Sequence, residues 1–318
     1  MIKKEGCGFG MISYHPSAMT VEIKQFVDSL ICDSGYSNER SLKVVDATLG
    51  DGGHSEVFLK CGCSVLGLDM DKESIERAQK RLNKIFKNID SPQDSLNKFE
   101  FQCFQSRHSQ IKKIMQKIGW KKCDIVFADL GARLDQLYRE DMSFHGVEEA
   151  DMRFDKSENT LTASEILNSY SEAQLNKIFK ESGIKGYKKI TNEIVRNRHI
   201  SSMPCKQLSE VLFENGVKRI HPSTKIFMAL RREVNRESQE LDLLLNSILE
   251  VIRAGGIGVF LTWHSAEDRQ VKTFYKKMER MGFGEIVTKK PIQPNESELV
   301  RMPQVRSAKL RVFKFNKI

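Results

Sequence analysis

The chain has 318 residues, 40% hydrophobic and 29% charged, a balance that excludes an extensively disordered or membrane-embedded protein. No apolar run is long enough to span a membrane, and the N-terminal sequence lacks the apolar core of a secretion signal, so we expect a cytoplasmic protein. The net charge of +9 favours a polyanionic partner, and the seven cysteines, which lack metal-ligand spacing, are expected to be reduced and mostly buried thiols.

The first part of the chain alternates apolar strands with amphipathic helices, a pattern that predicts successive βαβ units and a parallel sheet. A helix is predicted over 71–86, a polar loop over 87–98 and a basic helix around Ile111 to Ile118. The four expected strands are 42–47, 63–69, 99–104 and 123–129.

After residue 129 the alternation stops, and the next strong pattern is one long helix over roughly 225–253. We expect this helix to end at Ala254-Gly255-Gly256, since glycines commonly follow a helix C-terminus. A fifth strand over 257–262, a helix from about Ser265 and a last β region over 308–315 complete the predicted elements.

The charge distribution marks a separate module. Residues 134–172 carry ten acidic and three basic side chains, whereas the chain as a whole is basic. Together with the interrupted alternation, this predicts a mainly helical insertion at 134–221. The expected fold is therefore α/β, with a doubly wound and mostly parallel sheet formed by 1–133 and 222–318.

A glycine-rich segment, Asp46 to Ser55, joins the first strand to the first helix of the sheet. Glycines there allow positive φ and a close approach of the backbone to a ligand. Asp69 ends the second strand, 19 residues beyond Gly50, where an acidic side chain can accept hydrogen bonds from ribose hydroxyls. The pattern predicts a nucleotide-type cofactor, and the alternative is a tight turn without a ligand. Ser55 replaces the third glycine of a dinucleotide fingerprint, which weakens a dehydrogenase interpretation.

Two further strand ends carry candidate residues. Asp129 closes the fourth strand, where methyltransferases of this architecture place a group facing the methyl donor or the accepting amine; the alternative is a helix or turn cap. Trp263 and His264 follow the fifth strand, where an aromatic ring can stack on a flipped base, although a buried, satisfied histidine is an equal alternative. Ser265 with Asp268 forms an expected capping box.

Ordered motifs over most of the chain resemble the bacterial small-subunit rRNA cytosine-N4 methyltransferase family (RsmH/MraW). In chain order these motifs are Tyr14-His15-Pro16, Val45-Asp46-Ala47-Thr48-Leu49-Gly50, Gly52-Gly53-His54-Ser55, Asp129-Leu130-Gly131, Gln136-Leu137, Ser143-Phe144, Asp151-Met152-Arg153-Phe154-Asp155, Thr162-Ala163-Ser164-Glu165, His221-Pro222-Ser223-Thr224, Ala229-Leu230-Arg231 with Asn235, His264-Ser265, Glu267-Asp268-Arg269, Thr288-Lys289-Lys290-Pro291-Ile292 and Arg306-Ser307-Ala308-Lys309-Leu310-Arg311-Val312. So many matches in the same order make the resemblance specific.

The resemblance implies a class I (Rossmann-like) methyltransferase core, S-adenosyl-L-methionine as cofactor, and a cytidine of 16S rRNA in the decoding region as substrate. The insertion would recognise the substrate, and the partner would be small-subunit rRNA or the assembling 30S subunit, with no membrane and no metal; a monomer and a homodimer both stay open. From their positions at the strand ends, we expect Asp129, beside the amine, and His264, beside the base, to be the catalytic residues. The implied cofactor-binding residues are Gly52, Gly53, His54, Asp69, Phe104, Asp129 and Gln136.

The chain departs from the family pattern near the expected amine. The family follows Asp-Leu-Gly with a Ser-Ser-Pro-Gln-Leu-Asp-like segment, whereas this chain has Ala132 to Tyr138, and Trp263 replaces the usual Phe before His-Ser. Glu148-Glu149 also replaces a Gly-Pro. Two alternatives to the methyltransferase therefore stay open: an inactive relative that acts as an RNA-binding or ribosome-assembly factor, and an NAD-dependent dehydrogenase.

Four basic runs are candidates to hold RNA phosphates. Each of them, taken singly, is more often a solvated face of a helix or loop. The runs are Lys185 to Lys189, Arg196 to Arg198, Lys218-Arg219 and Arg306 to Arg311.

Overall fold

The computed structural model describes residues 17–33, 41–88, 100–143, 145–157, 160–196, 198, 205 and 222–317. Several expectations lie outside the described residues. They are the motif Tyr14-His15-Pro16, most of the polar loop 87–98, Phe144, the basic pair Lys218-Arg219, and His221. The six cysteines in the described part of the chain are free, but Cys32 is exposed and just three of them are buried.

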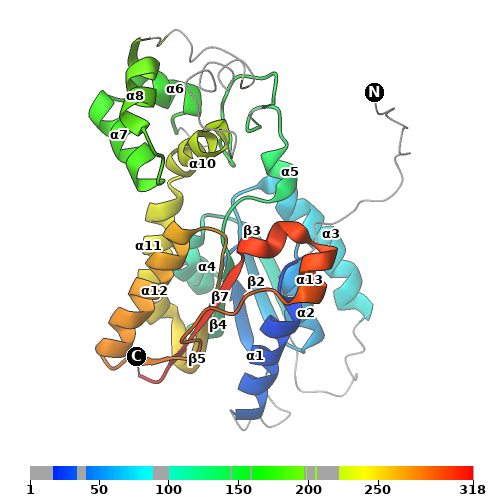
Figure 1. Cartoon of the computed structure of the whole chain (residues 1–318). Coiled ribbons are helices and arrows are strands. Elements are labelled where there is room, and N and C mark those ends of the chain that lie inside the picture. Colours follow the sequence, from blue (N-terminus) through cyan, green and yellow to red (C-terminus); the bar gives the residue numbers. More distant parts are fainter. Residues whose placement is uncertain are drawn as a thin grey trace.

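The described strands form one seven-stranded sheet in the order β3-β2-β1-β4-β5-β7-β6 (Figure 1). Strands β1 to β5 run parallel to one another, and β7 lies antiparallel between β5 and β6. This arrangement confirms the predicted doubly wound, mostly parallel sheet. The strands are β1 Lys43–Asp46, β2 Ser64–Asp69, β3 Phe101–Gln105, β4 Cys123–Asp129, β5 Ile252–Thr262, β6 Gly284–Ile286 and β7 Lys309–Phe315.

Both faces of the sheet are covered by helices, as the continuous apolar strands require. Along β1, Val44 faces one hydrophobic cluster and Val45 faces the other. In Figure 1, α1, α2 and α3 lie on one side of the sheet, and α4, α11 and α12 on the other. The helices of this core are α1 Thr20–Asp33, α2 Gly53–Lys60, α3 Lys72–Asn88, η1 His108–Gln110, α4 Ile111–Lys117, α11 Glu237–Val251, α12 Ser265–Arg280, α13 Glu296–Arg301 and η3 Pro303–Ser307.

A second group of helices lies above the carboxyl ends of the strands (Figure 1). It has its own hydrophobic cluster, in which Leu175 and Phe179 pack against Ile226 and Leu230. The helices are α5 Leu134–Leu137, α6 Ala163–Ser169, α7 Glu172–Glu181, α8 Tyr187–Arg196 and α10 Pro222–Val234. We therefore propose that the inserted unit extends from 134 through α10, beyond the boundary at 221 that the sequence suggested.

The predicted long helix over 225–253 is wrong, because the chain breaks it into α10 and α11. Arg236 lies between them in the left-handed conformation, with φ of 53°. Val234 packs into the cluster of the inserted unit, whereas Leu241 packs against the sheet. The helical periodicity continues across the break, but the two segments serve different cores, so one straight helix cannot satisfy both.

The predicted helix end at Ala254-Gly255-Gly256 is also wrong. Helix α11 ends at Val251, and the three residues lie within β5. Gly255 has a φ of 80°, and the pairing of β4 with β5 shifts register between Cys123 and Ile125. The glycines thus permit an irregularity in a strand rather than a helix cap. Among the described helices, none combines the length and apolar character that a membrane crossing requires.

Candidate active site

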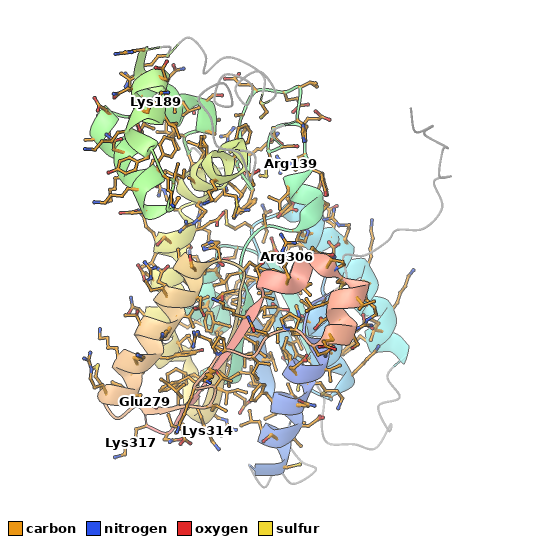
Figure 2. All side chains as sticks on the ribbon, viewed as in Figure 1. Arg139, Lys189, Glu279, Arg306, Lys314 and Lys317 are labelled. Carbon is orange, nitrogen blue, oxygen red and sulfur yellow. The ribbon has the colours of Figure 1, made fainter. Side chains whose placement is uncertain are left out.

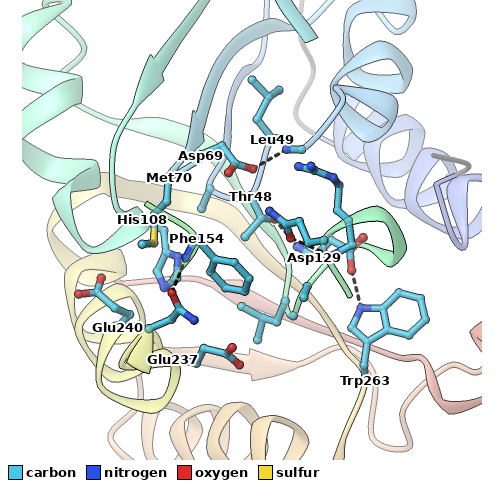
Figure 3. Close-up of a pocket in the computed structure, with 18 of the residues that line it drawn as sticks. Thr48, Leu49, Asp69, Met70, His108, Asp129, Phe154, Glu237, Glu240 and Trp263 are labelled. Atoms are coloured by element: carbon cyan, nitrogen blue, oxygen red, sulfur yellow. Dashed lines mark hydrogen bonds between the residues drawn. The ribbon is translucent and has the colours of Figure 1, made fainter. Parts of the chain in front are cut away.

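A pocket opens at the carboxyl ends of the parallel strands, where β1 lies between β2 and β4 (Figure 3). The chain continues from β1 in one direction across the sheet and from β4 in the other, which is the usual place for a ligand in a doubly wound sheet. The turns after β1, β2, β4 and β5 all contribute side chains to its wall. Residues that are far apart in the sequence therefore meet there.

The glycine-rich turn forms one wall of the pocket. Gly50 and Gly52 have φ of 50° and 78°, values that residues other than glycine rarely adopt. Gly52 is the residue before the first turn of α2, and it directs the chain into that helix. Gly53 lines the pocket and lies so close to Ser17 that a Cβ atom would come within 1.8 Å of the Ser17 Oγ. Gly52 itself is not among the lining residues; it sets the path of the backbone.

Asp69 connects the glycine-rich turn to the end of β2. Its Oδ2 accepts a hydrogen bond from the Gly50 N–H at 2.8 Å, and its Oδ1 accepts one from the Asp71 N–H at 2.9 Å. Burial raises the pKa of Asp69, although these two bonds and the charge of Arg133 oppose the shift. The side chain lines the pocket, as expected for a residue that binds ribose hydroxyls.

The divergent loop after β4 closes the pocket from the side of α3. Arg133 lines the pocket, and its Nη2 lies 3.0 Å from Asp71 Oδ2 and 2.9 Å from Asp135 Oδ2. Burial would raise the pKa of Asp71, but hydrogen bonds from Ser74 and Arg133 outweigh it and lower that pKa. The predicted Gln136 also lines the pocket and accepts a hydrogen bond from the Arg133 N–H. The ion pairs of Arg133 were not foreseen from the sequence.

Asp129 lines the pocket, and hydrogen bonds to Thr48 and Trp263 hold it in place (Figure 3). Its N–H donates to Thr48 Oγ1 at 2.6 Å, and its Oδ1 accepts from the Trp263 indole N–H at 2.8 Å. Its Oδ2 lies 3.8 Å from Nδ1 of His54. The ends of β1, β4 and β5 are therefore tied together at Asp129, through its backbone N–H and its carboxylate.

His54 faces Asp129 as a neutral ring. Burial lowers its pKa despite the hydrogen bond to Ala18, so the ring is uncharged at neutral pH. Its Nε2 lies 2.8 Å from the Ala18 carbonyl oxygen. Because a carbonyl oxygen can only accept, Nε2 carries the proton and Nδ1 presents a lone pair to the pocket side. The pocket therefore offers two acceptors, His54 Nδ1 and Asp129 Oδ2, near each other.

The opposite wall belongs to the inserted unit and the helix break. Phe154 lines the pocket, and Asn235 fixes it by accepting a hydrogen bond from the Phe154 N–H at 2.9 Å. The Asn235 side chain also donates to the carbonyls of Met152 and Arg231, both at 2.8 Å. Met152 has a φ of 62°, a backbone conformation that residues other than glycine rarely adopt. The break between α10 and α11 thus holds an aromatic ring over the pocket.

Phe104 and His264, like Gly52, lie outside the set of residues that line the pocket. Phe104 packs against the hydrophobic cluster that contains Leu66 and Leu68, and the Lys117 Nζ lies 5.1 Å from its ring centre. Ser106 and His108, which follow β3, line the pocket in its place. Their position directly after the strand end was the available signal. Any cofactor role of Phe104 stays a prediction.

His264 is also absent from the lining residues and acts as the N-cap of α12. Its Nδ1 accepts a hydrogen bond from the Glu267 N–H at 3.3 Å. The predicted capping box of Ser265 with Asp268 is therefore wrong, because the cap is formed one residue earlier, by His264 with Glu267. Burial alone would raise the pKa of Glu267, but hydrogen bonds from His264 and the Trp263 N–H hold it below the usual range. The proposed contact of His264 with a base stays a prediction.

Three side chains near the pocket have the chemistry of metal ligands. Glu237, His264 and Glu267 bring ligand atoms within 4.8 Å of one another, a grouping that the sequence did not suggest. Glu237 forms an ion pair with the buried Arg231 at 2.8 Å. The other two pair with each other at 3.0 Å. Protein partners therefore account for the cluster, and we propose no metal there.

The fold and the pocket together define a class I methyltransferase. They combine the order β3-β2-β1-β4-β5-β7-β6, the antiparallel β7, a glycine-rich turn after β1 and acidic residues at the ends of β2 and β4. Residues 15–316 match the model of the MraW methylase family, so the chain belongs to that family. It is a methyltransferase, and the resemblance inferred from the motifs is confirmed.

Several curated relatives match over nearly their full length, and each is called ribosomal RNA small subunit methyltransferase H. The protein of Chlamydia caviae is 35% identical over 296 residues, which cover 89% of this chain and 94% of the relative. That of Persephonella marina is 34% identical, with 88% and 95% covered. That of Nitratiruptor sp. is 36% identical, with 87% and 93% covered.

Proposed function

We propose that this protein transfers a methyl group from S-adenosyl-L-methionine to the exocyclic N4 of a cytidine in the decoding region of 16S rRNA. The observation that carries the proposal is Asp129, which ends β4 inside the pocket and is fixed there by Thr48 and Trp263. The family membership and the names of the relatives support the same reaction. The dehydrogenase alternative has no comparable support.

The lining residues fit the chemical groups of the cofactor. Asp69 is placed to accept hydrogen bonds from ribose hydroxyls, and Gly50 and Gly53 contribute backbone without side chains to the pocket wall. Gln136 and Arg133 would cover the nucleoside from the side of α5. When bound, S-adenosyl-L-methionine supplies an electrophilic methyl group on a sulfonium, whose charge disappears as the methyl group leaves.

Asp129 would act on the accepting amine. The N4 lone pair of cytosine is delocalised into the ring, so the nitrogen must pyramidalise before it forms a bond to carbon. Asp129 can accept a hydrogen bond from the N4–H and favour this change, and the released proton passes to solvent or to the carboxylate. Phe154 lies across the pocket, where its ring can stack on the base. Positioning of this kind contributes much of the rate in transfer reactions.

The RNA would be bound partly by the inserted unit. Lys185, Lys188 and Lys189 are exposed at and before the start of α8, and Figure 2 shows Lys189 at the far end of that unit, away from Arg306 on η3. Arg311 is unsuitable for a phosphate contact because it is buried and paired with Asp268. We propose small-subunit rRNA or the assembling 30S subunit as partner and the cytoplasm as location. A monomer and a homodimer are both compatible with this proposal.

Mass spectrometry of 16S rRNA from cells with and without the gene tests the proposed reaction. We expect N4-methylcytidine to disappear in the deletion strain and to return with the wild-type gene. Asp129→Ala should fail to restore it, with a rate at least about 100-fold lower, because the amine loses its acceptor. An unchanged spectrum in the deletion strain would overturn the proposal.

Calorimetry with the purified protein separates the remaining alternatives. Binding of S-adenosyl-L-methionine would favour the RNA-binding assembly factor if the mass spectrum of 16S rRNA is the same with and without the gene. Binding of NAD instead would favour the dehydrogenase.

A further inference from the structure

Trp263 makes a contact that a phenylalanine at the same position could not make. Strands β4 and β5 are parallel neighbours, and their pairing places Asp129 opposite Leu261. Trp263 follows two residues later and lines the pocket beside Asp129 (Figure 3). Its indole N–H donates to Asp129 Oδ1 at 2.8 Å. A hydrogen bond to an ionised oxygen is stronger and more directional than one between neutral groups.

The indole is itself held in place. The Trp263 backbone N–H donates to Glu267 Oε2 at 3.0 Å, and Glu267 is 6% exposed and paired with His264. On the other side, a Cβ atom at Gly131 would lie 3.5 Å from Trp263 Cδ1, so the ring packs against the Asp-Leu-Gly segment. The position of the ring is therefore fixed from α12 and from the end of β4.

Two of the three departures from the family pattern lie at this contact. The segment from Ala132 to Tyr138 has one hydroxyl side chain, that of Tyr138, which is 76% exposed and does not line the pocket, whereas the family pattern has two serines in this segment. Trp263 stands where the family has a phenylalanine, which carries no N–H. This chain thus provides a hydrogen-bond donor to Asp129 from the residue after β5, while the loop after β4 brings no hydroxyl into the pocket lining.

We propose that Trp263 is a positioning residue for methyl transfer, whose indole N–H orients the Asp129 carboxylate toward the accepting amine. This inference rests on the proposed function, in which Asp129 contacts the amine. The bond occupies Oδ1 and fixes the plane of the carboxylate, so that Oδ2 is presented on the side of His54. Loss of the donor would let the carboxylate rotate without removing its charge.

The test is Trp263→Phe, which keeps an aromatic ring but removes the donor. Single-turnover methyl transfer to 16S rRNA or 30S subunits should slow by roughly tenfold, the effect of losing one hydrogen bond to a charged group. The KM for S-adenosyl-L-methionine and the melting temperature should stay near the wild-type values. Trp120→Phe is the matched control, since Trp120 is buried away from the pocket lining and is the other tryptophan of the chain.

A second background separates positioning from packing. In Asp129→Asn, the added Trp263→Phe change should alter the rate by less than about twofold, because residues that act through one contact are not additive. An unchanged rate in Trp263→Phe alone, or an equal loss in both backgrounds, would overturn the inference. Full activity of Asp129→Asn would instead refute the proposed role of Asp129. If Asp129→Asn is inactive, the inference is tested by Trp263→Phe alone. A slower single-turnover rate with an unchanged KM for S-adenosyl-L-methionine supports it, and an unchanged rate contradicts it.

Discussion

The two sides of the pocket are built in different ways. The glycine-rich turn after β1 is defined by backbone conformation: Gly50 and Gly52 have positive φ, and Asp69 accepts a hydrogen bond from the Gly50 N–H. The loop after β4 is held by side chains, since Arg133 bridges Asp71 at the start of α3 and Asp135 within the loop. The turn therefore tolerates little change, whereas the loop can diverge if new ion pairs replace the old contacts.

The difference matters for function because both sides meet at Asp129. Thr48 of the turn accepts a hydrogen bond from the Asp129 N–H, and the divergent loop begins directly after Gly131 with Ala132. Motifs that match the family on one side can thus coexist with a departure from the family pattern on the other. Changes on the two sides should have effects of different size and kind.

The largest effect on stability and cofactor affinity is expected from a substitution in the glycine-rich turn. Gly52→Ala places a side chain at φ of 78° and brings its Cβ within 2.8 Å of the buried Leu82 Cδ1. We expect a loss of roughly 2–4 kcal/mol of folding stability and a clearly weaker affinity for S-adenosyl-L-methionine. Chemical denaturation and calorimetry measure the two effects.

Gly62→Ala is the control for backbone strain alone. Gly62 has a similar φ of 75°, but a Cβ atom there would meet nothing within 4 Å. Its cost should be about 1 kcal/mol without a change in cofactor affinity. Equal losses in Gly52→Ala and Gly62→Ala would show that packing against Leu82 is unimportant.

A smaller effect on cofactor affinity is expected from a substitution in the divergent loop after β4. Arg133→Ala removes the ion pairs that hold the loop beside the pocket, so the Kd for S-adenosyl-L-methionine should rise by roughly fivefold. Arg139→Ala is the matched control: Arg139 pairs with Asp141 at 2.7 Å on the same segment but does not line the pocket. Calorimetry should find the control unchanged. A similar Kd for both variants would contradict the proposal that the ion pairs of Arg133 hold the loop beside the pocket.

The smallest effect concerns pH. Burial lowers the pKa of His54 in the folded state, so the unfolded chain binds the proton more readily, with a pKa of about 6.5. Stability contributed by the neutral ring is present above pH of about 6.5 and is lost as the pH falls toward the folded pKa. His54→Gln keeps a donor for the Ala18 carbonyl but cannot ionise. The melting temperature of the wild type should therefore fall relative to the variant on acidification, and a constant difference would contradict this account.

Most of the sheet could be predicted because its signals are local. The strands ending at Asp69 and Asp129 are apolar runs closed by an acidic residue, and the structure confirms both ends. The helix over 225–253 could not be predicted correctly, since its periodicity is uninterrupted although Val234 and Leu241 belong to different clusters. A local pattern records which face is apolar but not which core that face meets.

The sequence by itself determined the parallel sheet, the glycine-rich turn and the acidic strand ends, because each depends on neighbouring residues and on backbone conformation. Five of its seven cofactor-binding candidates line the pocket, and they are Gly53, His54, Asp69, Asp129 and Gln136. Tertiary structure alone decided that His108 replaces Phe104 in the wall and that Trp263 donates to Asp129. The last contact joins residues 134 positions apart, and only the register of β4 with β5 brings them within hydrogen-bond distance.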